Sequence, residues 1–537
     1  MLCQSTERYA NQTAFHLADG SHITYRQFAE DIDALGTALI SAKRKPKRIG
    51  IIGANSYEWG LAYLATMNGA GIAVSLDKEL TKQELLDSVE RIKLDTIFYS
   101  DDVANKVLAT KKQGIIKTYI SMSPNSKEQT IQALIELGKQ APKRNRRTYQ
   151  QIKIDPDALA ALLFTSGTTS RSKIVMLSHR NITTDLIHGT AHFNLSPNDR
   201  FLSILPMHHM FECVAGFLAP LYSGSSIYFS QGIRHIGREF KDQKPTVVIC
   251  VPRVIEALSG KIWKGIREQG KEHIVRRLMS TTNALDRVGL HIKQKIFAKV
   301  HRELGGNIRF FLSGAASLNL KTAEDMTQLG FTIFQGYGLT ECSPAVAISY
   351  YRNNDPDSVG PPLAETDIYI DKPNADGNGE ILVKGPQVML GYYQNKAATK
   401  QVMHNGYFRT GDIGQIKKNG SLKIIGRLKN VIVTSGGKKI YPEELESLLL
   451  QCPAIKDVVV HGVEHNHGMQ ICASVVLAEN ESAPQKRQLE KIARSHIKAI
   501  NDNLAKYEQI HTIKIRNTDF VRTSTLKVKR HLISASQ

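Results

Sequence analysis

A polar, glycine-containing segment directly behind an apolar strand constrains this chain more than any other feature. Residues 158–164 are a short continuous apolar run, which predicts a strand buried in a mixed or parallel sheet. The run is followed by hydroxyl-bearing residues, one glycine and a lysine: Thr165, Ser166, Gly167, Thr168, Thr169 and Lys173. Backbone N–H groups, hydroxyls and a lysine that converge on a bend form a cradle for an anion such as phosphate.

This segment does not match the Walker phosphate loop, G-x-x-x-x-G-K-[ST]. Counted from Gly167, the second glycine of that loop falls on Ser172, and its Ser/Thr position falls on Ile174. The sequence therefore predicts a phosphate loop of a different kind, and partners elsewhere in the chain must support that interpretation.

Four later segments supply such partners, in chain order. Residues 335–344 (QGYGLTECSP) follow an apolar strand at 331–334 and place Tyr337, Thr340 and Glu341 on a glycine-rich loop. The other three segments carry charged side chains suited to a nucleotide: Asp412 on a turn in 406–414, Arg427 and Lys429 in 425–430, and Lys527 in 522–530.

Taken in this order, the five segments resemble the motifs of the adenylate-forming (AMP-binding) superfamily, in its long-chain fatty acyl-CoA synthetase branch, over roughly residues 15–531. The resemblance implies a large adenylation domain of several subdomains at 1–426, a hinge at 427–430 and a small mobile C-terminal domain at 431–537. The implied fold class is α/β, mixed α+β in parts. Apolar strands do alternate with amphipathic helices in the first half of the chain, which argues for α/β layers.

The resemblance also implies two half-reactions. A carboxylate attacks the α-phosphate of ATP to give an acyl-adenylate and pyrophosphate, and the thiol of CoA then takes the acyl group. Attack by an anion on an anionic phosphate needs positive charge and positioning more than acid–base chemistry. The residues implied to be catalytic are Lys527, Thr168 and Glu341, and the last two position Mg²⁺ through oxygen ligands.

Further nucleotide contacts follow from the same resemblance. Residues 165–169 and Lys173 hold the β- and γ-phosphates. Tyr337 stacks on the adenine. The residues that complete the nucleotide-binding set around Tyr337 are Gly314 and Ala315 in a small backbone platform, and Gly338 and Thr340 beside it.

The remaining motif residues are implied to bind the ribose or to act through movement of the small domain. Asp412 accepts the two ribose hydroxyls with Arg427 close by, and Lys527 bridges the attacking carboxylate and the phosphate. Because Lys527 belongs to the small domain, the resemblance implies that this domain rotates between the half-reactions. Lys429 occupies the hinge position, and Gly436 and Gly437 come to the thiol channel in the second state.

Two segments indicate which carboxylic acid is the substrate: 205–212 (LPMHHMFE) and 251–256 (VPRVIE). Both resemble their counterparts in long-chain fatty acyl-CoA synthetases. His209 matches the family position beside the acyl pocket. The substrate implied is a medium- or long-chain fatty acid, with CoA as the acceptor.

The phosphate loop departs from the family pattern, which typically has glycine, proline and glycine where this chain has Ser170, Ser172 and Ile174. Ser170 costs backbone freedom if its position needs a positive φ, and Ile174 adds bulk where the backbone usually runs close to its surroundings. Two alternatives to the CoA ligase therefore stay open. One is transfer of the acyl group to acyl carrier protein, and the other is a catalytically degenerate adenylate-fold protein that only binds its ligands.

The net charge of +20 bears on partners and location. Basic clusters at 43–48 and 143–147 have no interleaved aromatic residues for base stacking, which argues against a specific nucleic-acid role. Loose attraction to anionic membrane surfaces fits the charge better. The N-terminus lacks a basic-then-apolar signal pattern, and no apolar run is long enough to span a bilayer. The sequence thus predicts a cytoplasmic protein that is loosely peripheral to the membrane.

Overall fold

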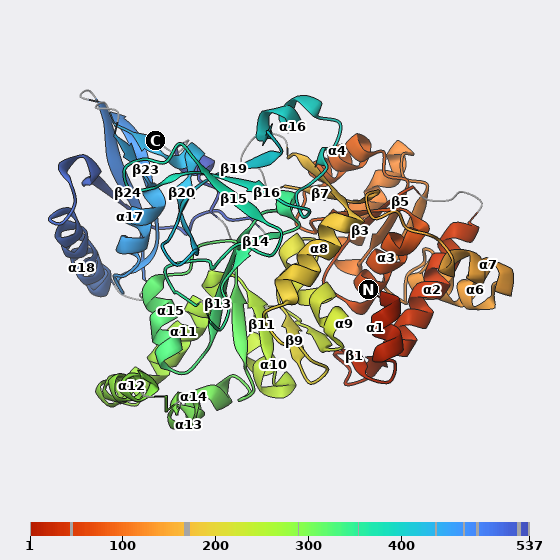
Figure 1. Ribbon diagram of the computed structural model, residues 1–537, viewed down its shortest axis with the longest axis horizontal. Coiled ribbons are helices and arrows are strands. Elements are labelled where there is room, and N and C mark those ends of the chain that lie inside the picture. The colour runs from red at the N-terminus through yellow and green to blue at the C-terminus, as the bar shows by residue number, and fades with distance from the viewer. Residues whose placement is uncertain are drawn as a thin grey trace.

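The computed structural model describes residues 2–42, 47–165, 172–232, 234–287, 289–290, 292–352, 354–434, 438–465, 468–478, 483–523 and 528–534. Within these ranges the chain forms a large N-terminal domain and a small C-terminal domain, which confirms the expected α/β fold class. Its strands make sheets of eight, seven and five strands and two smaller sheets of three and two strands. In Figure 1 the small domain, drawn in blue, lies at the opposite end of the molecule from the N-terminus.

The eight-stranded sheet is parallel except at its two edges. Its strands, in spatial order, are β14 (Ala345–Ile348), β13 (Ile333–Gly338), β12 (Phe310–Ser313), β11 (Val247–Cys250), β9 (Arg200–Ser203), β10 (Ser226–Phe229), β1 (Thr13–His16) and β2 (His22–Thr24). The central strands are buried on both faces, as the near-continuous apolar runs of parallel strands require.

The seven-stranded sheet joins an antiparallel edge to a parallel array. The antiparallel strands are β17 (Gly391–Tyr392), β8 (Ile174–Ser178) and β7 (Leu159–Phe164), and the parallel array continues with β4 (Ile72–Leu76), β3 (Arg48–Ile52), β5 (Thr96–Tyr99) and β6 (Thr118–Ser121). Strand β7 is the predicted apolar run, and it pairs antiparallel with β8, so the two described ends of the predicted phosphate loop, Thr165 and Lys173, lie next to paired strands.

The five-stranded sheet is antiparallel and leads to the small domain. It comprises β15 (Asp367–Asp371), β16 (Gly379–Lys384), β18 (Met403–His404), β19 (Tyr407–Ile416) and β20 (Leu422–Arg427). The small domain follows with β21 (Ile432–Val433), β22 (Lys439–Ile440), α17 (Pro442–Leu449), β23 (Ile455–His465), β24 (Gly468–Leu477), α18 (Ala483–Asn501) and β25 (Ile510–Arg516). These elements share a hydrophobic core made only of residues from Ile432 to Ile515.

One hydrophobic core unites the two largest sheets, and α8 (His179–Thr190) contacts both of them. The start of α8 is fixed by a capping box, in which Ser178 accepts from the Asn181 backbone and Asn181 accepts from the Ser178 backbone. The Asn181 side chain also donates to the carbonyl oxygens of Pro386 (2.7 Å) and Val388 (3.0 Å), which ties the helix to a distant loop.

Most other helices of the large domain lie on the faces of these sheets (Figure 1). The longer ones are α2 (Tyr25–Ser41), α3 (Tyr57–Ala65), α4 (Lys82–Ile92), α6 (Ile131–Gln140), α7 (Lys143–Gln150), α10 (Ile236–Gln243), α11 (Pro252–Glu268), α12 (Glu272–Arg287) and α15 (Leu320–Gln328). Among the described residues, no helix combines the length and the apolar composition needed to cross a bilayer.

Candidate nucleotide and acyl site

The two ends of the predicted phosphate loop are held by the β7–β8 hairpin. The backbone N–H of Thr165 donates to the carbonyl oxygen of Lys173 at 3.0 Å, next to the paired residues Phe164 and Ile174. The guanidinium of Arg91 donates to the carbonyl oxygen of Ser172 at 2.8 Å. The hairpin therefore fixes Thr165 and Lys173. The predicted loop residues Ser166, Gly167, Thr168 and Thr169 lie outside the described residues.

Lys173 and Glu341 meet at one aromatic ring. The ammonium of Lys173 lies 4.6 Å from the centroid of the Tyr392 ring, a cation–π distance. The hydroxyl of Tyr392 donates to Glu341 Oε1 at 2.9 Å. Burial, reinforced by the charge of Glu341, raises the pKa of the Tyr392 hydroxyl, so it stays a donor at neutral pH. The structure thus brings a cation and a carboxylate from separate motifs together.

Sequence reasoning missed Tyr392. It lies in β17, a strand of two residues that pairs with β8, and no apolar run or hydroxyl cluster marks this strand in the sequence. Only the register of β17 on β8, with Tyr392 opposite Val175, places its ring beside Lys173.

Tyr337 and Asp412 also come together, and both lie in strands rather than in the predicted loop and turn. Strand β13 continues through Tyr337 to Gly338 because β14 pairs with it, Tyr337 opposite Ala347. Strand β19 runs through Asp412, which lies opposite Arg427 on β20. The glycines of these segments were wrongly taken as signs of irregular backbone.

A buried hydrogen-bonded group results. Asp412 is 4% exposed, and its Oδ2 accepts the Tyr337 hydroxyl at 2.8 Å. Its Oδ1 lies 3.0 Å from Nε of Arg427, whose side chain is about half exposed. Burial, with a further contribution from the Asp412 charge, raises the pKa of Tyr337. Asp412 and Arg427 therefore lie together as the sequence predicts, with Tyr337 as an additional donor to Asp412.

Close backbone approach surrounds this group. A Cβ on Gly338 would lie 1.8 Å from the carbonyl oxygen of Pro344, so no larger residue fits there. A Cβ on Gly314 would lie 2.9 Å from the Phe211 ring, and Ala315 has a left-handed φ of +70°. Thr340 and Glu341 lie in a short 3₁₀ turn, Thr340–Cys342.

Gly338→Ala should destabilise the protein. The new methyl group overlaps a backbone oxygen, which cannot move aside as a side chain can, so β13 and the segment at Pro344 must shift apart. Overpacking of this kind costs about 1–3 kcal/mol. The thermal unfolding midpoint of Gly338→Ala should be lower than that of Gly411→Ala. At Gly411 φ is positive, but an added Cβ would meet no atom within 4 Å. Equal midpoints for both variants would contradict the overlap.

The segment 205–209 lies at the carboxyl end of β9, where parallel sheets bind ligands. Asn55 fixes this segment, since its amide donates to the Leu205 carbonyl oxygen at 2.7 Å and accepts from the Met207 N–H at 2.9 Å. The rings of His208 and predicted His209 are in contact, tilted by 44° with their centroids 4.0 Å apart.

His208 is 7% exposed, and its Nε2 lies 3.5 Å from Asp77 Oδ2. The ligand atoms of Asp77, His208 and His209 lie within 4.8 Å of one another, a spacing that a metal ion could bridge. Asp77 and His209 already have other interactions within the protein, so this geometry alone does not make a metal centre.

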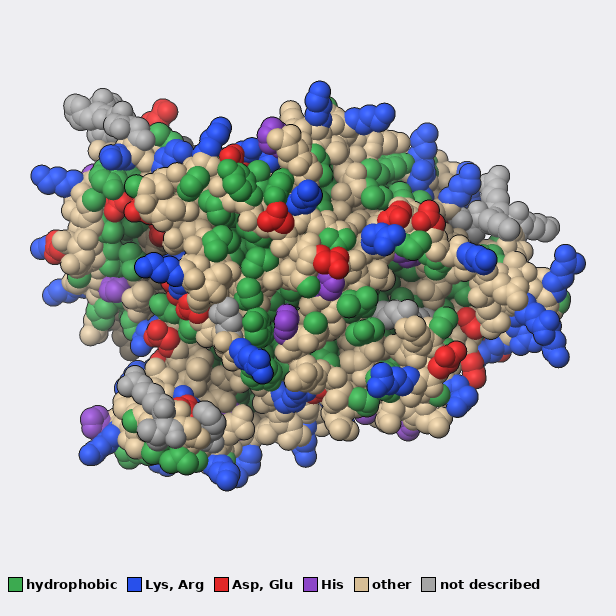
Figure 2. Space-filling view, in the orientation of Figure 1, with side chains coloured by type: hydrophobic (Ala, Val, Ile, Leu, Met, Phe, Trp, Pro, Cys, Tyr) green, Lys and Arg blue, Asp and Glu red, His purple; other side chains and the backbone are tan. Residues whose placement is uncertain are grey.

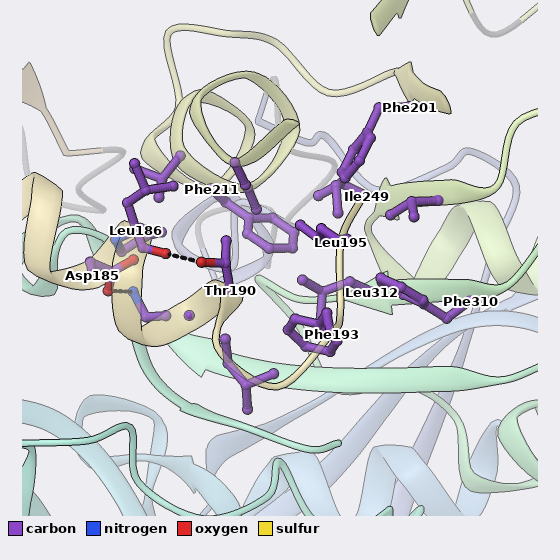
Figure 3. Close-up of a pocket in the computed structure, with 18 residues that line it drawn as sticks. Asp185, Leu186, Thr190, Phe193, Leu195, Phe201, Phe211, Ile249, Phe310 and Leu312 are labelled. Carbon is purple, nitrogen blue, oxygen red and sulfur yellow. Dashed lines mark hydrogen bonds between the residues drawn. The ribbon is translucent and has the colours of Figure 1, made fainter. Parts of the chain in front are cut away.

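An apolar cavity lies between α8, the π-helical segment Glu212–Leu218, and strands β11 and β12 (Figure 3). Aliphatic and aromatic side chains dominate its walls, among them Leu186, Phe193, Leu195, Phe211, Ile249 and Leu312. Pro344 and Ala345, just after the Glu341 motif, also line it, and Leu312 precedes the Gly314–Ala315 platform. The cavity therefore lies next to the polar site.

Glu212 is buried beside this cavity. Its Oε1 accepts the Ser203 hydroxyl at 2.6 Å, and its Oε2 has no hydrogen-bond partner among the described residues. Burial raises the pKa of Glu212 to about 8. The carboxyl group is therefore largely protonated in the folded protein at neutral pH.

Glu212 should make stability fall as pH rises. Its folded pKa of about 8 exceeds the ordinary value of 4.5, so between these pH values the folded state keeps a proton that the unfolded state releases. The unfolding free energy then falls with pH, by at most about 1.4 kcal/mol per unit. Glu212→Gln should flatten this slope in denaturant titrations from pH 5 to 8. An unchanged slope would show that Glu212 ionises normally.

The small domain approaches the carboxyl end of β11. Asp457 on β23 ion-pairs with Arg522 and lies 3.9 Å from Arg253 at the start of α11. The backbones of Arg522 and Val528 also form an isolated antiparallel β-bridge. Lys527 lies between these two residues but outside the described ones, as do Gly436 and Gly437.

Lys429 lies in the turn Leu428–Asn430, between the five-stranded sheet and the small domain. Partial desolvation, together with the charge of Arg427, lowers the pKa of its ammonium. The predicted hinge residue is exposed at the junction and lies close to Arg427.

Family models match most of the chain. One described as AMP-binding enzyme covers residues 2–393, and one described as AMP-binding enzyme C-terminal domain covers residues 444–527. Fatty acyl-CoA synthetase A of Dictyostelium discoideum is 29% identical over 491 residues, which cover 83% of this chain and 71% of the relative. Long-chain-fatty-acid–CoA ligase 1 of Homo sapiens is 30% identical over 477 residues, covering 82% of this chain and 67% of the relative.

Solved structures share the whole fold. ATP-bound MatB from Rhodopseudomonas palustris has a TM-score of 0.79 at 22% identity, and the match covers 100% of this chain and 98% of that one. o-Succinylbenzoate CoA synthetase (MenE) from Bacillus subtilis, in complex with ATP and magnesium ion, has a TM-score of 0.74 at 23% identity. This match covers 99% of this chain and 98% of that one. At these identities the likeness establishes the fold alone.

Proposed function

The chain belongs to the AMP-binding enzyme family, and from that premise we propose that it is an ATP-dependent fatty acid–CoA ligase. It activates a medium- or long-chain fatty acid as the acyl-adenylate and transfers the acyl group to CoA, with release of AMP and pyrophosphate. The names of its curated relatives, a fatty acyl-CoA synthetase and a long-chain-fatty-acid–CoA ligase, support this substrate class.

The observation that carries the proposal is the position of the apolar cavity. Its walls are aliphatic and aromatic, and it reaches the segment just behind Glu341, which lies with Lys173 around the Tyr392 ring. An aliphatic acid would bind with its chain toward these apolar walls and its carboxylate toward the polar site.

The polar residues suit a nucleotide and Mg²⁺. Asp412 is a buried acceptor beside Arg427, which fits a ribose diol. Glu341 offers the hard oxygen that Mg²⁺ prefers, with Thr168 as its proposed second ligand. The ion would neutralise charge on the phosphates, while Lys173 and residues 165–169 hold them.

The two half-reactions require two arrangements of the small domain. We assign residues 1–426 to the adenylation domain, 427–430 to the hinge with Lys429 at its centre, and 431–537 to the moving domain. Support comes from the separate hydrophobic core of residues 432–515 and from the turn at 428–430. In the first arrangement Lys527 neutralises the reacting carboxylate and phosphate. In the second, Gly436 and Gly437 line the path of the thiol.

Ile174, one of the three departures from the family's phosphate loop, does not favour a degenerate protein. Ile174, which stands where the family has glycine, is the first residue of β8 and packs in the hydrophobic core around β4 and β5. Its bulk is therefore accommodated inside the sheet rather than beside the nucleotide.

Pyrophosphate release with ATP, Mg²⁺ and a chain-length panel of fatty acids tests the proposal, with and without CoA. CoA-stimulated release that peaks at one chain length is expected. Release that only acyl carrier protein stimulates would make the carrier protein the acceptor. No release with any fatty acid would overturn the assignment.

A further inference from the structure

A basic lobe projects from the large domain, away from the nucleotide and acyl site. It comprises α12, α13 (Lys293–Ile296) and α14 (Ala298–Glu303), and its core side packs on α11 and α15. In Figure 1 these helices lie at the lower left edge of the molecule, and Figure 2 shows hydrophobic and basic side chains side by side on this lobe.

Helix α12 has an inner and an outer apolar side. On the inner side, Met279 is buried in the core shared with α11 and α15, and Val275 packs against that core. On the outer side, Ile274 is 57% exposed and Leu278 is 36% exposed. Helical spacing puts these two residues on one stripe, with Lys271 on one flank and Arg277 on the other.

The exposed apolar surface continues beyond α12. Leu290, just after the helix, is 54% exposed, and Ile296 in α13 is 42% exposed. Single exposed apolar residues are ordinary on a protein surface, whereas several large ones on one projecting lobe, flanked by charge, indicate an interaction surface.

The charge of the lobe is strongly one-sided. Residues 261–303, which comprise the lobe and the adjoining end of α11, contain eleven Lys and Arg against four Asp and Glu. The four acidic residues each have a basic neighbour, in the pairs Glu268–Lys264, Glu272–Arg276, Asp286–Lys293 and Glu303–Lys241. Among the described residues, no carboxylate lies within ion-pair distance of Lys271, Arg277 or Lys295. The basic charge next to the apolar stripe is therefore available to a partner.

We propose that the basic lobe docks on the surface of an anionic phospholipid bilayer. Exposed Ile and Leu side chains enter the boundary between headgroups and acyl chains, and flanking Lys and Arg side chains contact the anionic headgroups, the pattern of interfacial helices. No described helix can span a bilayer, so the contact is peripheral. A second copy of the chain fits poorly, because a symmetric contact would face two lobes of like charge.

Docking goes beyond the ligase activity but serves it, since fatty acids partition into bilayers. The test does not depend on that activity. It measures cosedimentation with vesicles of phosphatidylcholine alone or mixed with phosphatidylglycerol, at low salt and without ATP. Binding is expected only to the anionic vesicles, and it should weaken as salt is added.

Two lobe variants separate the apolar and electrostatic contributions. Ile274→Ser/Leu278→Ser and Lys271→Gln/Arg277→Gln should each weaken vesicle binding by about tenfold or more. The matched control is Arg144→Gln/Arg147→Gln on α7, which removes two exposed charges at the opposite end of the molecule and should leave binding within about twofold. All variants should keep the wild-type circular dichroism spectrum and thermal unfolding midpoint, which shows that they fold.

Three outcomes would overturn the proposal. Wild-type protein that ignores anionic vesicles has no such surface. An equal loss in the α7 control would mean that net charge, rather than the lobe, drives binding. A wild-type dimer that Ile274→Ser/Leu278→Ser dissociates would assign the apolar stripe to a second copy.

Discussion

Lys527→Ala should reduce acyl-adenylate formation by about 10²- to 10³-fold, the loss typical when one stabilising group for developing charge is removed. A carboxylate and a phosphate repel each other, and the proposed role of Lys527 is to neutralise both in the first half-reaction. Thioester formation from supplied acyl-adenylate and CoA should be largely unchanged. Pyrophosphate exchange measures the first step, and single-turnover thioester formation measures the second.

Lys529→Ala is the matched control for Lys527→Ala. Lys529 lies two residues further on, and its backbone N–H donates to the carbonyl oxygen of Val521, so it belongs to the same tail. Both half-reactions should survive its replacement. If Lys527→Ala impaired both half-reactions equally, the division of labour between two domain arrangements would be wrong.

The buried apolar strands were the most predictable part of this fold. The run 158–164 became β7, at Leu159–Phe164, because its residues are buried on both faces of a sheet. Helix α17 begins at Pro442, which Glu443 and Glu444 follow in its first turn. In each case a local pattern, either a continuous apolar run or proline and acidic residues at a helix start, is sufficient information.

Strand pairing between distant segments was not predictable in the same way. Tyr337 and Asp412 have glycine neighbours, which locally favour a loop, yet β14 and β20 pair with their segments and hold them extended. Such pairing depends on the positions of other strands, and tertiary context then overrides local preference. The same holds for Tyr392, whose role depends on one register.

The candidate site was predicted as a set of motifs but not as a geometry. The family resemblance assigns Lys173 and Glu341 to one nucleotide site. The Tyr392 ring that contacts both of them appears only in the fold. The cavity likewise appears only in the fold, since its walls come from α8, β11, β12 and the helical segment 212–218. Side chains from separated segments define its volume, and no local pattern encodes that.

Asp412→Ala should have the second large effect, on ATP binding and on stability. Charge-assisted hydrogen bonds contribute about 1.5–3 kcal/mol each, so loss of two bonds to the ribose should lower kcat/KM for ATP by about 10²- to 10⁴-fold. The change also leaves the buried Tyr337 hydroxyl without its acceptor, which costs about 1–3 kcal/mol of unfolding free energy.

A second substitution separates these two effects. Tyr337→Phe keeps the ring proposed to stack on adenine and removes only the hydroxyl that donates to Asp412. The double variant Tyr337→Phe/Asp412→Ala should therefore recover most of the stability lost in Asp412→Ala, because no hydroxyl is left unpaired. Its kcat/KM for ATP should stay as low as that of Asp412→Ala, since the proposed ribose acceptor is still missing. Recovery of kcat/KM in the double variant would mean that Asp412 acts on the nucleotide only by holding Tyr337.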